Sequence, residues 1–168
     1  MIIRRIKKED LETRVEWMNN PAIYSSMHYD IPIVLENTLS WFKKNLDNNN
    51  RADVVFEEDD KIVAMGGLTG IDSLTNKAEL YIFVNPFQQS KGIGTKATKL
   101  LCKYGFDNLG LKKIYLVTDV SNVSAQKVYE KVGFKLEGKL RKEYLTKDGI
   151  LEDILYFGLL KEEWNKND

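Results

Sequence analysis

The chain has 168 residues, of which 25 are Lys or Arg and 25 are Asp or Glu, so its formal net charge at pH 7 is zero. This length predicts a single domain over residues 1–168 with a core of its own. A neutral chain argues against a general nucleic-acid binder, which carries a basic excess. The start, MIIRRIKKED, has no long apolar run, so it predicts neither a signal peptide nor a membrane span. We therefore expect a cytoplasmic protein with neither a nucleic acid nor a membrane as partner.

The chain contains one cysteine, Cys102, and one histidine, His28. A single cysteine cannot form an internal disulfide. Cys102 falls on the apolar side of a helical pattern, so we interpret it as a core thiol. A single histidine argues against a His/Cys metal cluster and against a Ser-His-Asp triad. We expect no metal ion.

The pattern of apolar residues predicts alternating strands and helices, without an internal repeat or a low-complexity linker. Segment 21–33 is predicted to be a loop, and TKDG at 146–149 predicts a hairpin turn. The expected elements are strand 2–6, helices 8–20 and 34–46, a hairpin within 51–72, strand 77–84, helix 92–109, strand 112–120, helix 122–132, and strands 134–145 and 150–160. Hairpins combined with one βαβ crossover predict an α+β sheet with helices on both faces.

A basic loop with two glycines, Gly92 and Gly94, lies between the strand at 77–84 and the following helix. Backbone N–H groups at the start of a helix have no partner inside the helix, and glycine lets a phosphate approach them closely. Lys91 adds a positive charge beside them. Strand, loop and helix together predict a phosphate site, although glycines can also serve turn geometry alone.

Two common phosphate motifs fit this loop poorly. The Walker A motif, G-x-x-x-x-G-K-[ST], is absent. Residues 92–97, GIGTKA, fit the dinucleotide fingerprint G-x-G-x-x-A, and Asp119 lies near where a ribose-binding acid belongs. However, NPFQQSK separates the glycines from their strand, and only 49 residues follow Asp119, which is too few for a second mononucleotide-binding half.

The loop fits another pattern better, namely Q-x-x-G-x-G over residues 89–94, and residues 122–134 fit N-x-x-[SA]-x-x-x-Y-x-K-x-G-F. These two segments resemble motifs A and B of the GNAT acetyltransferases, which transfer an acetyl group from acetyl-coenzyme A to an amine. Segment 133–164 is similar to the subgroup containing ribosomal-protein N-terminal, spermidine and amino-sugar N-acetyltransferases. The resemblance covers nearly the whole chain and is closest over residues 77–164.

The resemblance implies a three-layer α+β GNAT fold. The expected sheet is mixed and mostly antiparallel, with about seven strands, helices on both faces and a splayed central pair of parallel strands. It also implies acetyl-CoA as cosubstrate, with pantetheine on the strand and the pyrophosphate in the loop. The residues so implied are Ile82, Phe83 and Val84 on the strand, Gln89, Ser90, Lys91, Gly92, Ile93, Gly94 and Thr95 in the loop, and Asn122 and Lys131 in the second motif. On spacing alone, Asn122 is equally well explained as a helix cap.

Tyr129 and Glu79 are the expected catalytic residues. The resemblance places Tyr129 near the thioester sulfur, where its phenol, protonated at pH 7, can protonate the leaving thiolate. A backbone N–H near Phe83 or Val84 would hold the oxyanion. An amine attacks only when neutral, so a base must remove its proton. Glu79 is the expected base, directly or through water, and Asp153 is a further candidate. A structural ion pair is the alternative explanation for each of them.

The acceptor side is expected to include residues near Glu79 and in the loop at 21–33. These residues are Tyr81 and Asn85, which share the strand parity of Glu79, and Tyr24, His28 and Tyr29. The rings and polar groups of Tyr24, His28 and Tyr29 suit a sugar or a peptide, although packing of the loop would also explain them. Segments 17–27 and 31–42 are most similar to the amino-sugar branch of the family, and this resemblance makes an amino-sugar nucleotide the favoured acceptor.

Several alternatives remain open for function. A polyamine needs an acidic pocket, and segment 21–42 offers only Asp30 and Glu36. A ribosomal-protein N-terminus is a further acceptor, and a non-catalytic acetyl-CoA-binding module is a different class. A nicotinamide-dependent oxidoreductase is more distant. A homodimer is compatible with the sequence.

Overall fold

A computed structural model of the chain describes residues 1–88 and 92–164. Its strands form one seven-stranded sheet in the order β1-β2-β3-β4-β5-β7-β6. Neighbouring strands are antiparallel, except for β4 and β5, which run parallel. The strands are β1 (Ile2–Arg5), β2 (Arg51–Glu58), β3 (Lys61–Asp72), β4 (Lys77–Val84), β5 (Lys113–Asp119), β6 (Lys135–Leu145) and β7 (Leu151–Leu160).

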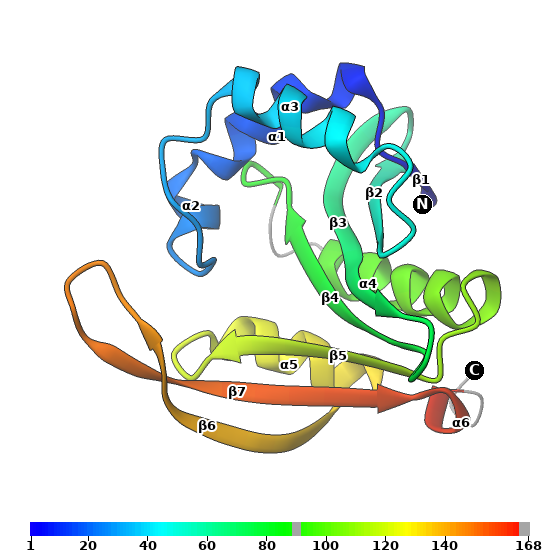
Figure 1. Ribbon diagram of the computed structural model, residues 1–168, viewed down its shortest axis with the longest axis vertical. Helices are drawn as coiled ribbons and strands as arrows, with labels where there is room; N and C mark the ends of the chain where they lie inside the picture. The colour runs from blue at the N-terminus through cyan, green and yellow to red at the C-terminus, as the bar shows by residue number, and fades with distance from the viewer. Residues whose placement is uncertain (89–91, 165–168) are drawn as a thin grey trace.

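Helices lie on both faces of this sheet (Figure 1). On one face are α1 (Leu11–Met18), α2 (Pro21–Tyr24) and α3 (Leu35–Asn45), and on the other are α4 (Ile93–Lys103) and α5 (Val123–Val132). The remaining helical segments are η1 (Lys8–Asp10), η2 (Tyr104–Asn108) and α6 (Lys161–Trp164). Among the described helices, none is long and apolar enough to cross a membrane.

Two apolar cores form because strand β2 is buried on both faces. Val54 and Phe56 point into the larger core, which β2 shares with α4 and α5. Val55, at the intervening position, packs with Trp17 of α1 and Phe83 of β4 in the smaller core. Successive strand residues point to opposite faces, so one continuous apolar run supplies both layers.

Strands β4 and β5 separate soon after they meet. They pair over three positions only, from Lys77 with Lys113 to Glu79 with Tyr115. Beyond these positions β4 continues beside β3 as far as Val84, while β5 continues beside β7 as far as Asp119. The two strands therefore diverge in the direction in which both run, as Figure 1 shows.

This architecture confirms the expected GNAT fold class, including helices on both faces and the splayed parallel pair. Two local predictions differ from the structure. The helix predicted over 92–109 ends at Lys103 and continues as the π-type turn η2, and the loop predicted at 21–33 begins with the short helix α2. In α2, Pro21 is the first residue and the Asn20 side chain caps the helix, which are local signals of a helix start. Cys102 is fully buried, and burial raises the pKa of its thiol.

We predict that Gly66→Ala destabilises the protein by about 1–3 kcal/mol. A Cβ on Gly66 would lie 2.6 Å from the backbone oxygen of Tyr81, so β4 itself would have to move. Gly138→Ala is the matched control, because nothing lies within 4 Å of its added Cβ. Chemical denaturation of both variants measures the difference, and equal stabilities would contradict the prediction.

Candidate active site

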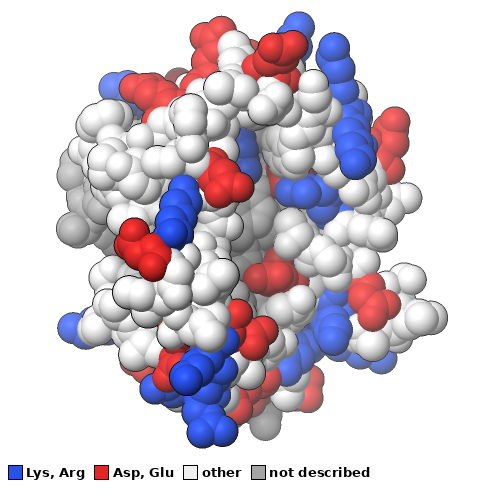
Figure 2. Space-filling model, turned by 60° about the vertical axis from the view of Figure 1, so that its left-hand side comes forward, with Lys and Arg blue, Asp and Glu red and all other residues white. Residues whose placement is uncertain are grey.

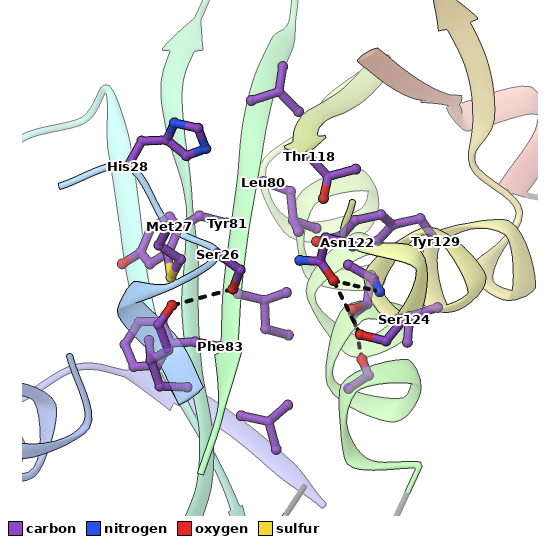
Figure 3. Close-up of a pocket in the computed structure, with 18 of the residues that line it drawn as sticks. Ser26, Met27, His28, Leu80, Tyr81, Phe83, Thr118, Asn122, Ser124 and Tyr129 are labelled. Carbon is purple, nitrogen blue, oxygen red and sulfur yellow. Dashed lines mark hydrogen bonds between the residues drawn. The ribbon is translucent and has the colours of Figure 1, made fainter. Parts of the chain in front are cut away.

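A cavity of about 680 Å³ occupies the gap between the diverging strands. In Figure 3, segment 26–28 and the side chains of Tyr81 and Phe83 lie on one side of the space, and Thr118, Asn122 and Tyr129 lie on the other. The first side belongs to β4 and the segment after α2, and the second to β5 and α5. Both halves of the sheet therefore contribute to one site.

The first turn of α4 forms one end of the cavity. Gly92 precedes the helix with φ +74°, a left-handed conformation that favours glycine. The N–H groups of residues 93–95 come before the first bond of the helix, which runs from the Lys96 N–H to the Gly92 oxygen at 3.1 Å. A Cβ on Gly94 would lie 3.6 Å from Cγ2 of Val84, so this turn packs closely against β4. The geometry offers a positive helix end to an anion.

Asn122 lines the cavity and also caps α5. Its Oδ1 accepts hydrogen bonds from the Ala125 N–H and from the Ser124 hydroxyl, both at 3.2 Å. Its amide nitrogen has no partner among the described residues and can donate to a ligand. The cap and the ligand-binding interpretations of Asn122 are thus compatible, because they use different atoms.

Tyr129 is buried, with its ring packed against Phe134 and Phe157 at centroid distances of 6.0 and 6.1 Å. Its hydroxyl has no hydrogen-bond partner in the described part of the chain, where Nη1 of Arg14 is the only fully buried side-chain polar atom without one. The Tyr129 hydroxyl therefore reaches open space in the cavity that the residue lines. Burial raises the pKa of Tyr129 to about 12, which keeps the phenol protonated at neutral pH.

Carboxylates supply the charge around the cavity. Glu79 on β4 and Glu143 on β6 line it, and no Lys or Arg is among its described lining residues. Burial raises the pKa of the Glu79 carboxyl. Figure 2, which turns the open side of the molecule forward, shows a hollow in this face with both acidic and basic side chains around its edge. The described walls thus favour a cationic ligand.

The ring of Tyr81 forms part of the cavity wall, but its hydroxyl is already hydrogen-bonded within the protein. The hydroxyl donates to Oδ1 of Asp53 at 2.6 Å, and Arg51 also binds that carboxylate. Arg14 lies 5.7 Å from the Tyr81 ring and 5.4 Å from the Phe83 ring. Mainly because of burial, the pKa of Tyr81 is raised to about 12. Tyr81 can therefore contribute an aromatic surface rather than a proton.

His28 reaches from the segment after α2 to the far side of the cavity. Its Nε2 lies 2.7 Å from Oδ1 of Asp119, at the end of β5. Its ring meets that of Tyr144 on β6 edge-on, with centroids 3.4 Å apart and planes at 74°. The single histidine of the chain thus joins three segments that are distant in sequence.

The structure brings most of the expected site residues into one cavity. Those that line it are Glu79, Tyr129, Ile82, Phe83, Val84, Gly92, Gly94, Thr95, Asn122, His28 and Tyr81. Gln89, Ser90 and Lys91 lie outside the described residues. Among the others, Ile93 is buried in the larger core, although its N–H belongs to the first turn of α4.

The structure places the other expected residues away from the cavity lining. Lys131 is exposed in the last turn of α5, and Tyr24 is half-buried in α2. The Tyr29 hydroxyl donates to the Met18 oxygen at 2.7 Å, and Oδ1 of Asn85 accepts from the Phe87 N–H at 2.9 Å. Asp153 pairs with Lys139 at 2.8 Å across the β6–β7 hairpin, and this bond lowers the pKa of its carboxyl. These contacts are structural.

Sequence reasoning missed several lining residues that follow from helix and strand periodicity. Thr98 stands one turn after Gly94 on α4, and its Oγ1 donates to the Gly94 oxygen at 2.7 Å. Val128 stands one turn after Ser124 on α5. Glu143 and Tyr144 come from a distant hairpin, for which no local signal exists.

Three comparisons with known proteins agree with this geometry. A family model described as an acetyltransferase (GNAT) domain matches residues 1–135. A spermidine N(1)-acetyltransferase of Escherichia coli (strain K12) is 32% identical over 143 residues, which cover 84% of this chain and 76% of that protein. A putative ribosomal N-acetyltransferase, YdaF of Bacillus subtilis (strain 168), is 34% identical over 106 residues, which cover 63% of this chain and 57% of that protein. The crystal structure of a Vibrio cholerae spermidine N-acetyltransferase in complex with CoA and spermine has a TM-score of 0.91 and 25% identity, and the match covers 98% of this chain and 97% of that one.

A sheet whose central parallel strands diverge, with a helix that begins after a glycine at the gap, is the architecture of an enzyme that binds acetyl-CoA. The chain belongs to the GNAT acetyltransferase family. It is an acetyl-CoA-dependent N-acetyltransferase, as the sequence motifs predicted.

We predict that Gly94→Val weakens CoA binding about tenfold or more. The extra methyl groups would enter the contact between α4 and β4, where a Cβ alone is already 3.6 Å from Val84. Gly94→Ala is the graded control, because its Cβ makes ordinary contacts and should change the Kd little. Isothermal titration calorimetry measures both variants, and a valine variant with near-normal affinity would refute the assignment of this turn to the pyrophosphate.

Proposed function

We propose that this enzyme acetylates a small amine with more than one positive charge, of the polyamine class. The observation that carries the proposal is the charge of the cavity. Glu79 and Glu143 line it, and its described lining residues include no Lys or Arg. A polyamine is strongly favoured by such walls, because each ammonium group gains a nearby carboxylate. A nucleotide sugar would instead bring phosphate charges toward carboxylates.

The relatives support the polyamine acceptor over the amino-sugar nucleotide that the sequence favoured. Two of the similar proteins are described as spermidine acetyltransferases, and one was solved with spermine and CoA. The acids in question are Glu79 on β4 and Glu143 on the β6–β7 hairpin, outside the segment 21–42 on which the sequence-based argument relied. A protein N-terminus is a second candidate, which the similarity to the putative ribosomal acetyltransferase supports.

Acetyl-CoA, the acetyl donor, would lie in the gap between β4 and β5. We propose that pantetheine follows Ile82, Phe83 and Val84, where β4 no longer pairs with β5. The pyrophosphate would meet the first turn of α4, and the amide nitrogen of Asn122 would donate to the pantetheine arm. The residues fit such a ligand because Gly92 and Gly94 leave no side chain between the backbone and the cavity.

Tyr129 is proposed as the general acid. Its hydroxyl opens into the cavity, and a phenol with a pKa of about 12 stays protonated at assay pH while remaining able to give its proton to a thiolate. A backbone N–H near Phe83 or Val84 would stabilise the oxyanion. Glu79 is proposed to face the acceptor nitrogen and to attract its ammonium form. The proton of that ammonium has two candidate acceptors in the cavity, Glu79 and His28.

We predict turnover with spermidine or a related polyamine, and none with a UDP-amino sugar. Glu143→Gln should raise the KM for the polyamine about 2- to 5-fold, because it removes one partly solvated charge from the wall. Glu162→Gln, an exposed glutamate outside the cavity, is the control. Thiol release from acetyl-CoA reports the rates, and turnover with the sugar but not the polyamine would overturn the proposed acceptor.

We predict that Tyr129→Phe lowers kcat about 10²-fold or more while the Kd for acetyl-CoA changes little. The ring contacts with Phe134 and Phe157 are kept, so the loss isolates the hydroxyl. Since burial raises the pKa of Tyr129 to about 12, the wild type should show no loss of activity from its ionisation below about pH 10. Steady-state kinetics with calorimetry test both statements, and unchanged turnover would remove Tyr129 as the acid.

A further inference from the structure

The pair formed by His28 and Asp119 has the geometry of an oriented base. The Asp119 side chain is only 12% exposed, and its Oδ1 lies 2.7 Å from Nε2 of His28. An ionised carboxylate can only accept a hydrogen bond, so a neutral His28 must carry its hydrogen on Nε2. Nδ1 is then the bare nitrogen of the ring, and it has no partner among the described residues. A carboxylate that fixes a histidine tautomer in this way prepares the other nitrogen to accept a proton.

The surroundings of His28 leave this nitrogen available to an acceptor molecule. His28 lines the cavity, and its side chain is 28% exposed, so it stands at the mouth rather than in a core. The titratable groups in contact with it are Asp119 of β5 and Tyr144 of β6, and Glu79 of β4 and Glu143 of β6 line the same cavity. No Lys or Arg among the described lining residues competes with the acceptor ammonium for these carboxylates.

Glu79 is less suited to the same step. A carboxylate beside an ammonium group stabilises the charged form of the amine and therefore opposes its deprotonation. This effect suits a residue that holds the ammonium in place. An imidazole is neutral before it receives the proton, so it does not stabilise the ammonium form in this way and can act as a general base.

We propose that His28, oriented by Asp119, is the general base of this N-acetyltransferase. Nδ1 of His28 takes a proton from the acceptor ammonium, and the freed lone pair on nitrogen forms a C–N bond to the thioester carbon. The C–S bond then breaks, and its electron pair stays on sulfur, which takes the hydroxyl proton of Tyr129. The second proton on nitrogen returns to the Tyr129 oxygen, and His28 releases its proton to solvent at the mouth. The net products are the amide, the free thiol and one proton.

Asp119 is a positioning residue in this scheme, because it acts only through His28. The proposal depends on amine acetylation in this cavity, and it does not depend on which amine is used. If the acceptor is an amine other than a polyamine, the proposal is unchanged, and the same kinetics are measured with the amine that the enzyme acetylates.

The test compares turnover, imidazole rescue and folding in four variants. His28→Ala should lower kcat about 10²-fold or more, and added imidazole should restore part of the rate. His28→Gln keeps a side-chain amide able to donate to Asp119 but cannot take up a proton, so it should fold normally and stay inactive. Asp119→Asn should lower kcat with little change in the KM for acetyl-CoA. Glu79→Gln, the matched control, should mainly raise the KM for the amine.

Three results would overturn the proposal. One is normal turnover in His28→Gln. Another is a loss of rate in His28→Ala that imidazole does not restore while the melting temperature stays at the wild-type value. The third is a kcat loss in Glu79→Gln that equals the loss in His28→Gln, because Glu79 would then be the proton acceptor.

Discussion

The early end of the pairing between β4 and β5 is the constraint on which the site depends. Polar backbone groups that leave a sheet need other partners, so a strand edge freed in the middle of a sheet is costly unless something binds there. Here the pairing stops after Glu79 and Tyr115, and the gap holds the cavity. Helix α4 starts at one end of the gap and α5 lines its side. The divergence therefore creates an unpaired edge, a helix N-terminus and the space for two reactants together.

The cavity also separates proton donors from proton acceptors by their surroundings. Apolar packing around Tyr129 disfavours its phenolate and keeps it a donor. At the mouth of the cavity, Nε2 of His28 lies 2.7 Å from Oδ1 of Asp119, and the His28 side chain is 28% exposed to solvent that can carry a proton away. In the proposed mechanism, the acid Tyr129 would therefore lie in the apolar wall of the cavity and the base His28 at its solvent-exposed edge. Acetyl transfer to an ammonium group needs this division, because one proton must leave for each turnover.

Much of the fold could be predicted from the sequence, because local patterns determine it. Asn122 and Gly133 mark the two ends of α5, and the apolar runs of β2 and β4 fit buried strands. The donor half of the candidate site followed from two contiguous motifs. The acceptor half followed only in part: Glu79, Tyr81 and His28 line the cavity as expected, but Glu143 and Tyr144 come from a hairpin far from residues 21–33. Tyr29 and Asn85 were expected at the site because of their type, but their polar atoms satisfy neighbouring backbone groups.

Asn122 connects the order of helix α5 to the binding of a ligand in the cavity between β4 and β5. Its oxygen holds the first turn of the helix through the Ala125 N–H, and its amide nitrogen points into the cavity (Figure 3). A ligand that takes a hydrogen bond from this amide fixes the side-chain rotamer that the cap requires. Helix fraying at Ala125 would then be suppressed by the donor substrate, and slower amide hydrogen exchange there would report binding without any change in the fold. An aspartate could cap the helix equally well. It could not couple ligand binding to the order of the first turn, however, because an ionised carboxylate has no hydrogen to donate to the ligand.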